Sequence, residues 1–297
     1  MISSLKRLKQ GDLIGVISPA SPVTVEEVEP AIKIIQQEGY RVLEGDHLYD
    51  AHGYLAGKDE DRLKDLHGMF QNSEVKAVLC ARGGYGTPRL LDRIDYNIIK
   101  ENPKLFIGYS DISALLLAIY HRTGMIVWHG PMLKGEEGWE KNLKNLLKHL
   151  SSEEKMDIRL AGENVLRKGN AGGKLLGGNL TLMSSILGTP FFPALDGSIL
   201  FLEDRGEPLY RIDRMLTHLK LSGVLDGIKG VIAGNFRDCG DMDEINRLLL
   251  EIFSGERPVY TGFPAGHGKE NIPIPFGIRA ELNTEVMSFS VDGFFDK

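Results

Sequence analysis

The stretch 104-KLFIGYSDISALLLAIY-120 decides the fold. Its apolar residues 105–108 predict a short buried strand, and residues 111–123 have helical spacing, with Gly124 as the terminator. Ser110 falls at the turn between the two elements. A strand that passes through a tight turn into a helix is typical of open α/β sheets, whose ligand sites lie at the carboxyl ends of the strands. We therefore expect the Ser110 hydroxyl at such a site.

The same alternation of strand and helix continues on both sides of this stretch. Strands are predicted at residues 13–18, 40–43, 75–81 and 125–128, and helices at 59–71 and 139–150 as well as before residue 38. The start of that first helix stays open, because Thr24 and Glu27 form a capping-box pattern whereas Pro30 prefers a first turn. Thr87, followed by proline, is expected to cap another short helix. The pattern predicts a doubly wound parallel-sheet domain over residues 1–150.

The second half of the chain has a different pattern. Residues 151–178 are charged and glycine-rich, and we interpret them as a linker. Beyond them, strands are expected at 198–202, 230–233, 258–261 and 285–291, the last as an edge or hairpin strand, with helices at 180–187, 210–221 and 242–253. Residues 179–297 are therefore predicted to form a second domain, a β-rich α+β one.

Composition limits the classes of function. The chain has 297 residues, 42% of them hydrophobic and 26% charged, which predicts a globular protein of two domains. A net charge of −6 without long runs of one sign disfavours nucleic acid as a partner. The two cysteines, Cys80 and Cys239, are too far apart in sequence to suggest a disulfide framework or a metal cluster. No apolar stretch suits a signal peptide or a membrane span, so we predict a cytoplasmic protein without a membrane partner.

Two glycine-rich segments have some features of cofactor-binding loops but do not match their motifs. The segment 82-RGGYG-86 follows a predicted strand, and its backbone N–H groups could face a substrate, although a flexible turn explains it equally well. It lacks the last glycine of a dinucleotide fingerprint, and in 170-NAGGKLLGG-178 Leu175 stands where a P-loop has serine or threonine. No cofactor is predicted, and no metal site either, because histidine and cysteine ligands are not clustered.

A nucleophilic serine needs a base and a group that orients the base. Among eight histidines, His267 stands out because glycines flank it in a loop after a predicted strand, and His129 is the second choice. Glu203 is the first charged residue after an apolar strand and suits the orienting role, with Asp204 and Glu207 as alternatives. The alternative for the turn itself is that Ser110 or Asp111 only caps a helix.

Seven ordered segments of the chain together resemble the LD-carboxypeptidase family of serine peptidases. In order along the chain, these segments are GDLIGVISPASP, ARGGYGTPRLLDRIDY, FIGYSDISALL, VWHGPM, GGNLTLMSSILGTPF, ILFLEDRGEPLYRIDRML and AGHGKENIPIPFG. The resemblance implies Ser110 as nucleophile, His267 as base and Glu203 as the residue that orients it. It also implies an oxyanion hole from the N–H groups of Gly84 and Asp111, a site between an α/β domain and a β-rich domain, and a homodimer.

The resemblance implies a small peptide as substrate. The favoured reaction is hydrolysis of an L,D-peptide bond that releases the terminal D-alanine of murein tetrapeptides, with Arg82, Arg205 or Lys269 facing the terminal carboxylate. The alternative within the family is inactivation of microcin C-type peptidyl nucleotides, whose nucleotide would need an aromatic or cationic surface, sought between residues 139 and 178. An alternative outside the family is a non-catalytic protein that binds a small ligand between two domains. An α/β-hydrolase is disfavoured, because Ile112 stands in place of the second glycine of the G-x-S-x-G motif.

Overall fold

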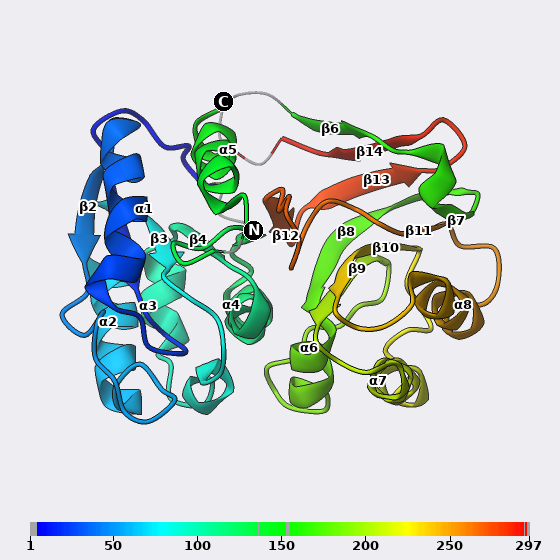
Figure 1. Ribbon diagram of the computed structural model, residues 1–297, viewed down its shortest axis with the longest axis horizontal. Helices are drawn as coiled ribbons and strands as arrows, with labels where there is room; N and C mark the ends of the chain where they lie inside the picture. Colours follow the sequence, from blue (N-terminus) through cyan, green and yellow to red (C-terminus); the bar gives the residue numbers. More distant parts are fainter. Residues whose placement is uncertain (1–4, 136, 153–154, 294, 296–297) are drawn as a thin grey trace.

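Two sheets, each built mainly from one half of the chain, form the centre of the protein (Figure 1). The computed structural model describes residues 5–135, 137–152, 155–293 and 295. The first sheet has the strand order β12-β5-β4-β3-β1-β2. Its five parallel strands come from the first half of the chain: β1 (Leu13–Ile17), β2 (Arg41–Glu44), β3 (Val75–Cys80), β4 (Leu105–Gly108) and β5 (Val127–His129). These strands are mostly buried, as expected for a parallel sheet covered on both faces.

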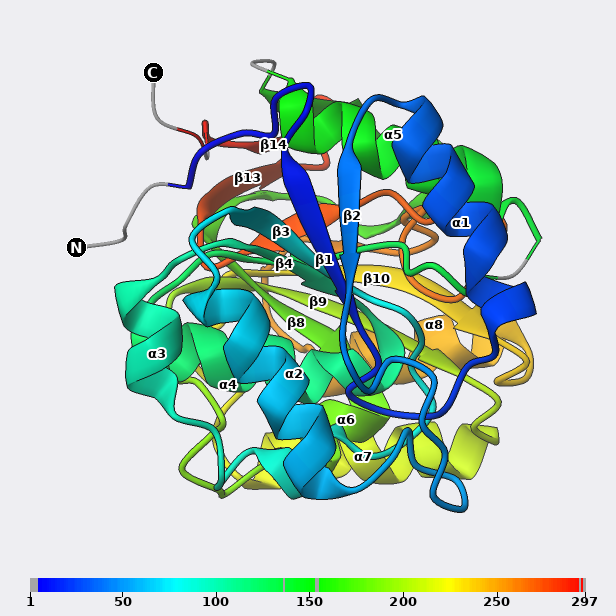
Figure 2. The ribbon, with the colours of Figure 1, turned by 90° about the vertical axis from the view of Figure 1, so that its left-hand side faces the viewer.

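Helices cover both faces of this sheet (Figure 2). One face carries α1 (Val25–Gln37) and α5 (Trp139–Ser151), and the other carries α2 (Asp59–Gln71), α3 (Tyr96–Glu101) and α4 (Ser113–Thr123). Two short 3₁₀ turns, η1 (Thr87–Leu90) and η2 (Ser110–Ile112), follow β3 and β4. The predicted doubly wound parallel sheet is confirmed.

The start of α1 resolves the choice that the sequence left open. Thr24 is the N-cap, and its backbone N–H donates to Glu27 Oε2 at 3.1 Å in a capping box. Pro30 lies inside the helix rather than in its first turn. The short helix after β3 begins differently from the prediction: Gly86, not Thr87, is its N-cap.

The strand order reverses between β1 and β3, which are neighbours although β2 lies between them in sequence. The loops that leave the carboxyl ends of these two strands are held together by Ser21. Its N–H donates to Gly83 O at 3.2 Å, and its Oγ accepts from Tyr85 N at 3.1 Å. Ligands of open α/β sheets bind at such a switch point.

The second sheet has eight strands in the order β6-β14-β13-β8-β9-β10-β11-β7. Four central strands are parallel: β8 (Asn170–Asn179), β9 (Ser198–Arg205), β10 (Gly230–Arg237) and β11 (Val259–Tyr260). The antiparallel ones are β6 (Met156–Arg159), β7 (Val165–Arg167), β13 (Arg279–Asn283) and β14 (Ser288–Val291). Its helices are α6 (Leu180–Ile186), α7 (Leu209–Leu221) and α8 (Met242–Ile252), with one 3₁₀ turn, η3 (Gly162–Asn164).

Residues 151–178, which were expected to be a linker, contain strands of the second sheet. The stretch contributes β6, β7 and most of β8 to the second sheet. The glycines that suggested flexibility allow close packing in β8 instead, since a Cβ at Gly173 would lie 2.3 Å from the backbone oxygen of Gly197. The tail strand β14 pairs with β13 as a hairpin and is flanked by β6, so it is not an edge strand.

The two halves meet along β12 and α4 (Figure 1). Strand β12 (Ile274–Phe276), from near the end of the chain, is antiparallel to β5 and completes the first sheet. The end of β8 packs on the start of α4, where Asn179 N donates to Ser113 Oγ at 3.0 Å. As a result, the carboxyl ends of β4, β8 and β9 face a common space. None of the helices in the described part of the chain is both long and apolar enough to cross a membrane.

Gly177 tests how tightly β8 and β9 are packed beside this space. Its φ is +148°, and a Cβ there would lie 1.8 Å from the backbone oxygen of Phe201. We expect Gly177→Ala to lower the free energy of unfolding by about 2 to 4 kcal/mol, because the backbone of β9 must move. Urea denaturation measures the loss.

The matched control is Gly188→Ala, where φ is +78° and nothing lies within 4 Å of an added Cβ. Only the cost of a left-handed alanine remains there, about 1 kcal/mol. Equal losses in the two variants would contradict the close approach of β8 to β9.

Candidate active site

Ser110 lies at a strained turn directly after β4. Its φ is +62°, in the left-handed region that residues with a side chain rarely adopt. Gly108 permits this turn, because a Cβ there would lie 2.7 Å from the Ile112 side chain. Such strain is found at functional turns, among them the nucleophile elbow of serine hydrolases. Ser110 itself is half-buried and lies just past the carboxyl end of β4, where its hydroxyl was expected.

The glycine loop after β3 packs directly against this turn. A Cβ at Gly83 would lie 2.8 Å from Ser110 Cβ, and one at Gly84 would lie 2.2 Å from Ser21 Oγ. Gly84 also has a φ of +105°. Its N–H has no acceptor among the described residues. The loop therefore needs glycines in order to bring free backbone donors next to the serine, and it is more than a flexible turn.

Asp111 follows Ser110 directly, and its side chain does not line the cavity that Ser110 lines. Its carboxylate is buried and turned towards the start of η1, where Oδ2 accepts from Thr87 N at 2.8 Å. Burial raises the pKa of this carboxyl, against the hydrogen bonds from Thr87. The N–H of Asp111 lies in the first turn of η2, where helical N–H groups have no intrahelical partner.

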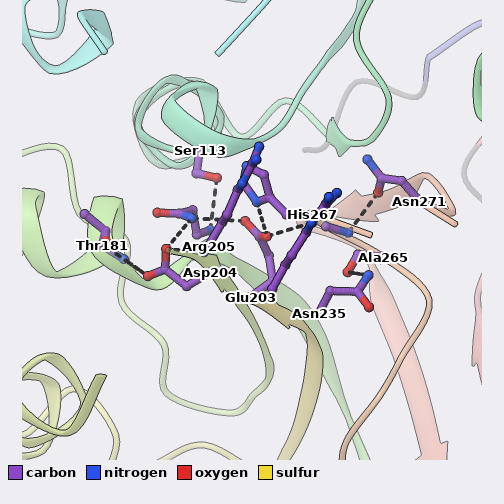
Figure 3. Close-up of polar contacts among 12 residues, drawn as sticks. Ser113, Thr181, Glu203, Asp204, Arg205, Asn235, Ala265, His267 and Asn271 are labelled. Carbon is purple, nitrogen blue, oxygen red and sulfur yellow. Dashed lines mark hydrogen bonds and ion pairs between the residues drawn. The ribbon is translucent and has the colours of Figure 1, made fainter. Parts of the chain in front are cut away.

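Glu203 and His267 form a short hydrogen bond deep beside the same space (Figure 3). Glu203 Oε2 lies 2.6 Å from His267 Nδ1 and also accepts from His267 N at 3.1 Å. Glu203 is fully buried near the end of β9, and His267 is 7% exposed. The loop can hold the ring there because Gly266 leaves room: a Cβ at that position would lie 2.5 Å from Glu203 Oε2.

The other oxygen of Glu203 has its own surroundings. Oε1 accepts from Asn179 Nδ2 at 3.2 Å and lies 3.9 Å from Nε2 of the buried His129. Burial alone would raise the pKa of Glu203, but the interactions with His267 and His129 outweigh it and hold that pKa well below its ordinary value. Glu203 is therefore an anion, while His129, the second choice as base, is enclosed at 0% exposure and away from the pocket lining.

Ser110 and His267 line one cavity of about 360 Å³, together with Gly83, Gly84 and Tyr109. The ring of Tyr109 packs on the imidazole with centroids 4.9 Å apart. Burial raises the pKa of Tyr109 to about 12, so its phenol stays protonated. Among the described residues, Ser110 Oγ and His267 make no direct hydrogen bond. Such contacts are often long in ligand-free enzymes and tighten when substrate binds.

The alternatives to Glu203 have other partners. Asp204 accepts from Thr181 N at 2.9 Å, Thr181 Oγ1 at 2.8 Å and Asn179 Nδ2 at 3.0 Å. Burial and the charge of Glu203 raise the pKa of Asp204 to about 6. Glu207 lies on the wall of the cavity and pairs with Arg211. Neither carboxylate bonds to His267 among the described contacts, so only Glu203 is placed to orient that ring.

The three candidate cations are in different places. Arg82 and Arg205 line the cavity that contains Ser110. Lys269 lines the neighbouring hollow beyond His267 instead, where it pairs with Glu137 at 2.8 Å. Lys269 is therefore no longer a good candidate for a carboxylate in the cavity.

One group among the described residues has the composition of a metal site. Ligand atoms of His47, Asp50 and Asp61 lie within 4.8 Å of one another, in and near the loop after β2. Two of these residues already bond to each other, because His47 Nδ1 lies 2.8 Å from Asp50 Oδ2. None of the three lines the cavity with Ser110.

Asn179 and Tyr109 were not singled out from the sequence. The sequence could have indicated Asn179 as the N-cap of α6, because asparagine is favoured at that position, and its Oδ1 accepts from Leu182 N at 3.1 Å. Its amide, however, also reaches both Glu203 and Asp204. That second role depends on the packing of β8 beside β9, which local sequence does not determine.

Comparisons with known proteins agree with this geometry. Profiles of the LD-carboxypeptidase N-terminal and C-terminal domains match residues 14–130 and 172–282. The chain is 42% identical to a protein named probable murein peptide carboxypeptidase from Bacillus subtilis, covering 94% of this chain and 91% of that one. It is 34% identical to the murein tetrapeptide carboxypeptidase of Pseudomonas aeruginosa, covering 91% and 92%.

Solved structures show the same two-domain arrangement. An MccF-like protein from Bacillus anthracis superposes with a TM-score of 0.89 at 29% identity, covering 97% of this chain and 98% of that one. MccF in complex with glutamyl sulfamoyl guanosine also gives 0.89, at 25% identity and 99% coverage of both chains. Since the two domain profiles together span most of its length, the chain belongs to the LD-carboxypeptidase family.

Proposed function

We propose that the protein is a serine carboxypeptidase that releases the terminal D-alanine of murein tetrapeptides by hydrolysing an L,D-peptide bond. The observation that carries the proposal is the 2.6 Å bond between Glu203 and His267 in the wall of the cavity that Ser110 also lines. The names of the Bacillus and Pseudomonas relatives support murein peptides as the substrate class.

In the proposed mechanism, Ser110 Oγ attacks the carbonyl carbon of the scissile bond while His267 Nε2 takes the hydroxyl proton. Glu203, bonded to Nδ1, holds the ring in the tautomer that leaves Nε2 unprotonated and stabilises the imidazolium that forms. His267 then gives the proton to the leaving amine, and the C–N bond breaks. A water molecule repeats the sequence on the acyl-enzyme, which frees the acid and restores the Ser110 hydroxyl.

The oxyanion of each tetrahedral intermediate would be held by two backbone donors. The N–H of Gly84 has no acceptor among the described residues, and the N–H of Asp111 lies at the start of η2. Donors fixed before the reaction starts stabilise the transition state without reorganisation. The left-handed φ of Ser110 places this strained residue directly before Asp111, whose N–H is the second donor in the proposal.

The family alternative is a peptidyl-nucleotide substrate, supported by the sulfamoyl nucleotide bound to MccF. Of the described residues that line the cavity, Tyr109 has the only phenol, phenyl or indole ring, and that ring packs on His267. Trp139, in the region where a nucleotide surface was sought, lines an adjoining hollow instead. This lining favours a peptide without a nucleobase. The homodimer and the cytoplasmic location stay predictions.

Replacing the nucleophile gives the first test of the mechanism. We expect Ser110→Ala to lower kcat for tetrapeptide hydrolysis by at least about 10⁴-fold, with His267→Ala similar and the double variant no worse than either. D-alanine release measured by coupled oxidation gives the rates, and circular dichroism checks folding. Losses that multiply in the double variant would contradict a serine and histidine that act together.

Glu203→Gln tests the orienting role through both rate and stability. We expect kcat to fall by about 10³ to 10⁴-fold with little change in KM, because the amide no longer fixes the imidazole tautomer. Since the pKa of Glu203 is lowered from its ordinary value of 4.5, the ionised carboxylate stabilises the folded state above that pH, and the contribution is lost as pH falls further.

The stability difference between wild type and Glu203→Gln should therefore be larger at pH 5 than at pH 3 in urea denaturation, a range in which carboxyl groups rather than imidazoles ordinarily titrate. A difference that grows towards acid pH would reverse the sign and contradict an ionised Glu203.

A panel of substrates distinguishes the two candidate activities, cleavage of murein tetrapeptides and cleavage of peptidyl nucleotides. We expect mass spectrometry to show loss of terminal D-alanine from an L,D-linked tetrapeptide and no loss from the same peptide with terminal L-alanine. A peptidyl adenylate analogue should be cleaved much more slowly. Faster cleavage of that analogue would replace the murein proposal with the peptidyl-nucleotide one.

A further inference from the structure

Glu207 places a carboxylate in the wall of the cavity that the mechanism does not use. It follows β9 by two residues and precedes Pro208, the N-cap of α7. Its side chain is 20% exposed, so it is partly shielded from water. Glu207 lines the same cavity as Ser110 and His267. A charge held at this depth interacts more strongly with a bound ligand than one on an open surface.

The hydrogen bonding of Glu207 leaves one oxygen available. Oε2 lies 3.3 Å from Arg211 Nη1, and Arg211 is itself 53% exposed. Oε1 has no partner among the described residues. Arg211 holds the carboxylate in place through one oxygen, while the other can accept a hydrogen bond from a ligand.

Three other charged side chains of the cavity already have partners within the protein. Asp204 is saturated by its bonds from Thr181, Asn179 and the Arg205 backbone. Lys134 is paired with Glu27. Arg205 lies within 3.9 Å of Asp238, which does not line the cavity.

Arg82 is the available cation. Its Nη1 donates to Pro22 O at 3.0 Å, and no other bond of its guanidinium is present among the described residues. The loop that contains Arg82 lies against Ser110, whereas Glu207 belongs to the other half of the chain. The cavity is therefore bipolar, with a cation from one half and an anion from the other.

We propose that Glu207 binds the ammonium group of a cationic side chain in the peptide substrate, while Arg82 faces the terminal carboxylate. The inference rests on the proposed function and adds to it a residue that determines specificity, Glu207, from the second half of the chain. A diamino acid or lysine at the third position of a tetrapeptide has this chemistry. The opposite charges also fix the direction in which the peptide enters, because a carboxylate beside Glu207 would be repelled.

The test compares two tetrapeptides that differ only in charge, one with lysine before the terminal D-alanine and one with Nε-acetyl-lysine. Wild-type enzyme should have a kcat/KM about tenfold higher for the lysine peptide, as expected for one charge-assisted hydrogen bond that is partly exposed. In Glu207→Gln the preference should disappear through a higher KM for the lysine peptide, with kcat unchanged.

Glu163→Gln is the matched control, since Glu163 is exposed and does not line the cavity. It should keep the preference. Charge reversal in Glu207→Lys should invert it in favour of the acetylated peptide. Equal kcat/KM for the two peptides with wild-type enzyme, or an unchanged preference in Glu207→Gln, would overturn the role of Glu207.

Calorimetric binding to Ser110→Ala separates this inference from the proposed function. Tighter binding of the lysine peptide that depends on Glu207 would support the ammonium site even if wild-type enzyme released no D-alanine. Equal binding of the two peptides together with normal D-alanine release would refute the ammonium site and leave the carboxypeptidase intact.

Discussion

A buried negative charge on Glu203 is the constraint on which the site depends. An isolated carboxylate at 0% exposure would be strongly destabilising, and the fold tolerates it because three groups surround it. His267 donates from both its ring and its backbone, and Asn179 donates to the other oxygen. These partners come from one loop and one strand, since His267 lies between β11 and β12 and Asn179 ends β8. Loss of the His267 ring would remove the shortest of these bonds, and loss of Asn179 would leave Oε1 without a donor at hydrogen-bond distance among the described residues.

The second constraint is the way the two halves of the chain are joined. The serine turn follows β4 of the first sheet, whereas Glu203 belongs to β9 of the second. Strand β12 in the first sheet and the contact of β8 with the start of α4 fix one half against the other. The cavity is lined from both sides, so its shape and its charge pattern depend on that junction. In the proposed function, substrate selection and catalysis therefore both depend on this junction.

Local sequence was sufficient for elements whose geometry is set by near neighbours. The five parallel strands of the first sheet and the turn at Ser110 follow from apolar runs and glycine positions. Helix starts were less certain, because the start of α1 was left open and the N-cap of η1 is Gly86 rather than Thr87. The prediction failed at residues 151–178, because glycines in β8 serve close packing against β9, and a composition rich in glycine looks the same in a flexible segment. The choice of Glu203 over Asp204 and Glu207 was open from spacing. Only the fold shows that Asp204 is bonded to Thr181 and that Glu207 faces the cavity.

The most direct measurement is labelling with a fluorophosphonate, a reagent that reacts with activated serines, followed by peptide mapping. We expect one adduct, on Ser110, formed rapidly by the wild-type protein and lost in the His267→Ala variant, in which the hydroxyl has no base. An unlabelled wild-type protein, or an adduct on Ser110 that forms equally fast without His267, would contradict the central claim that these two residues act as nucleophile and base.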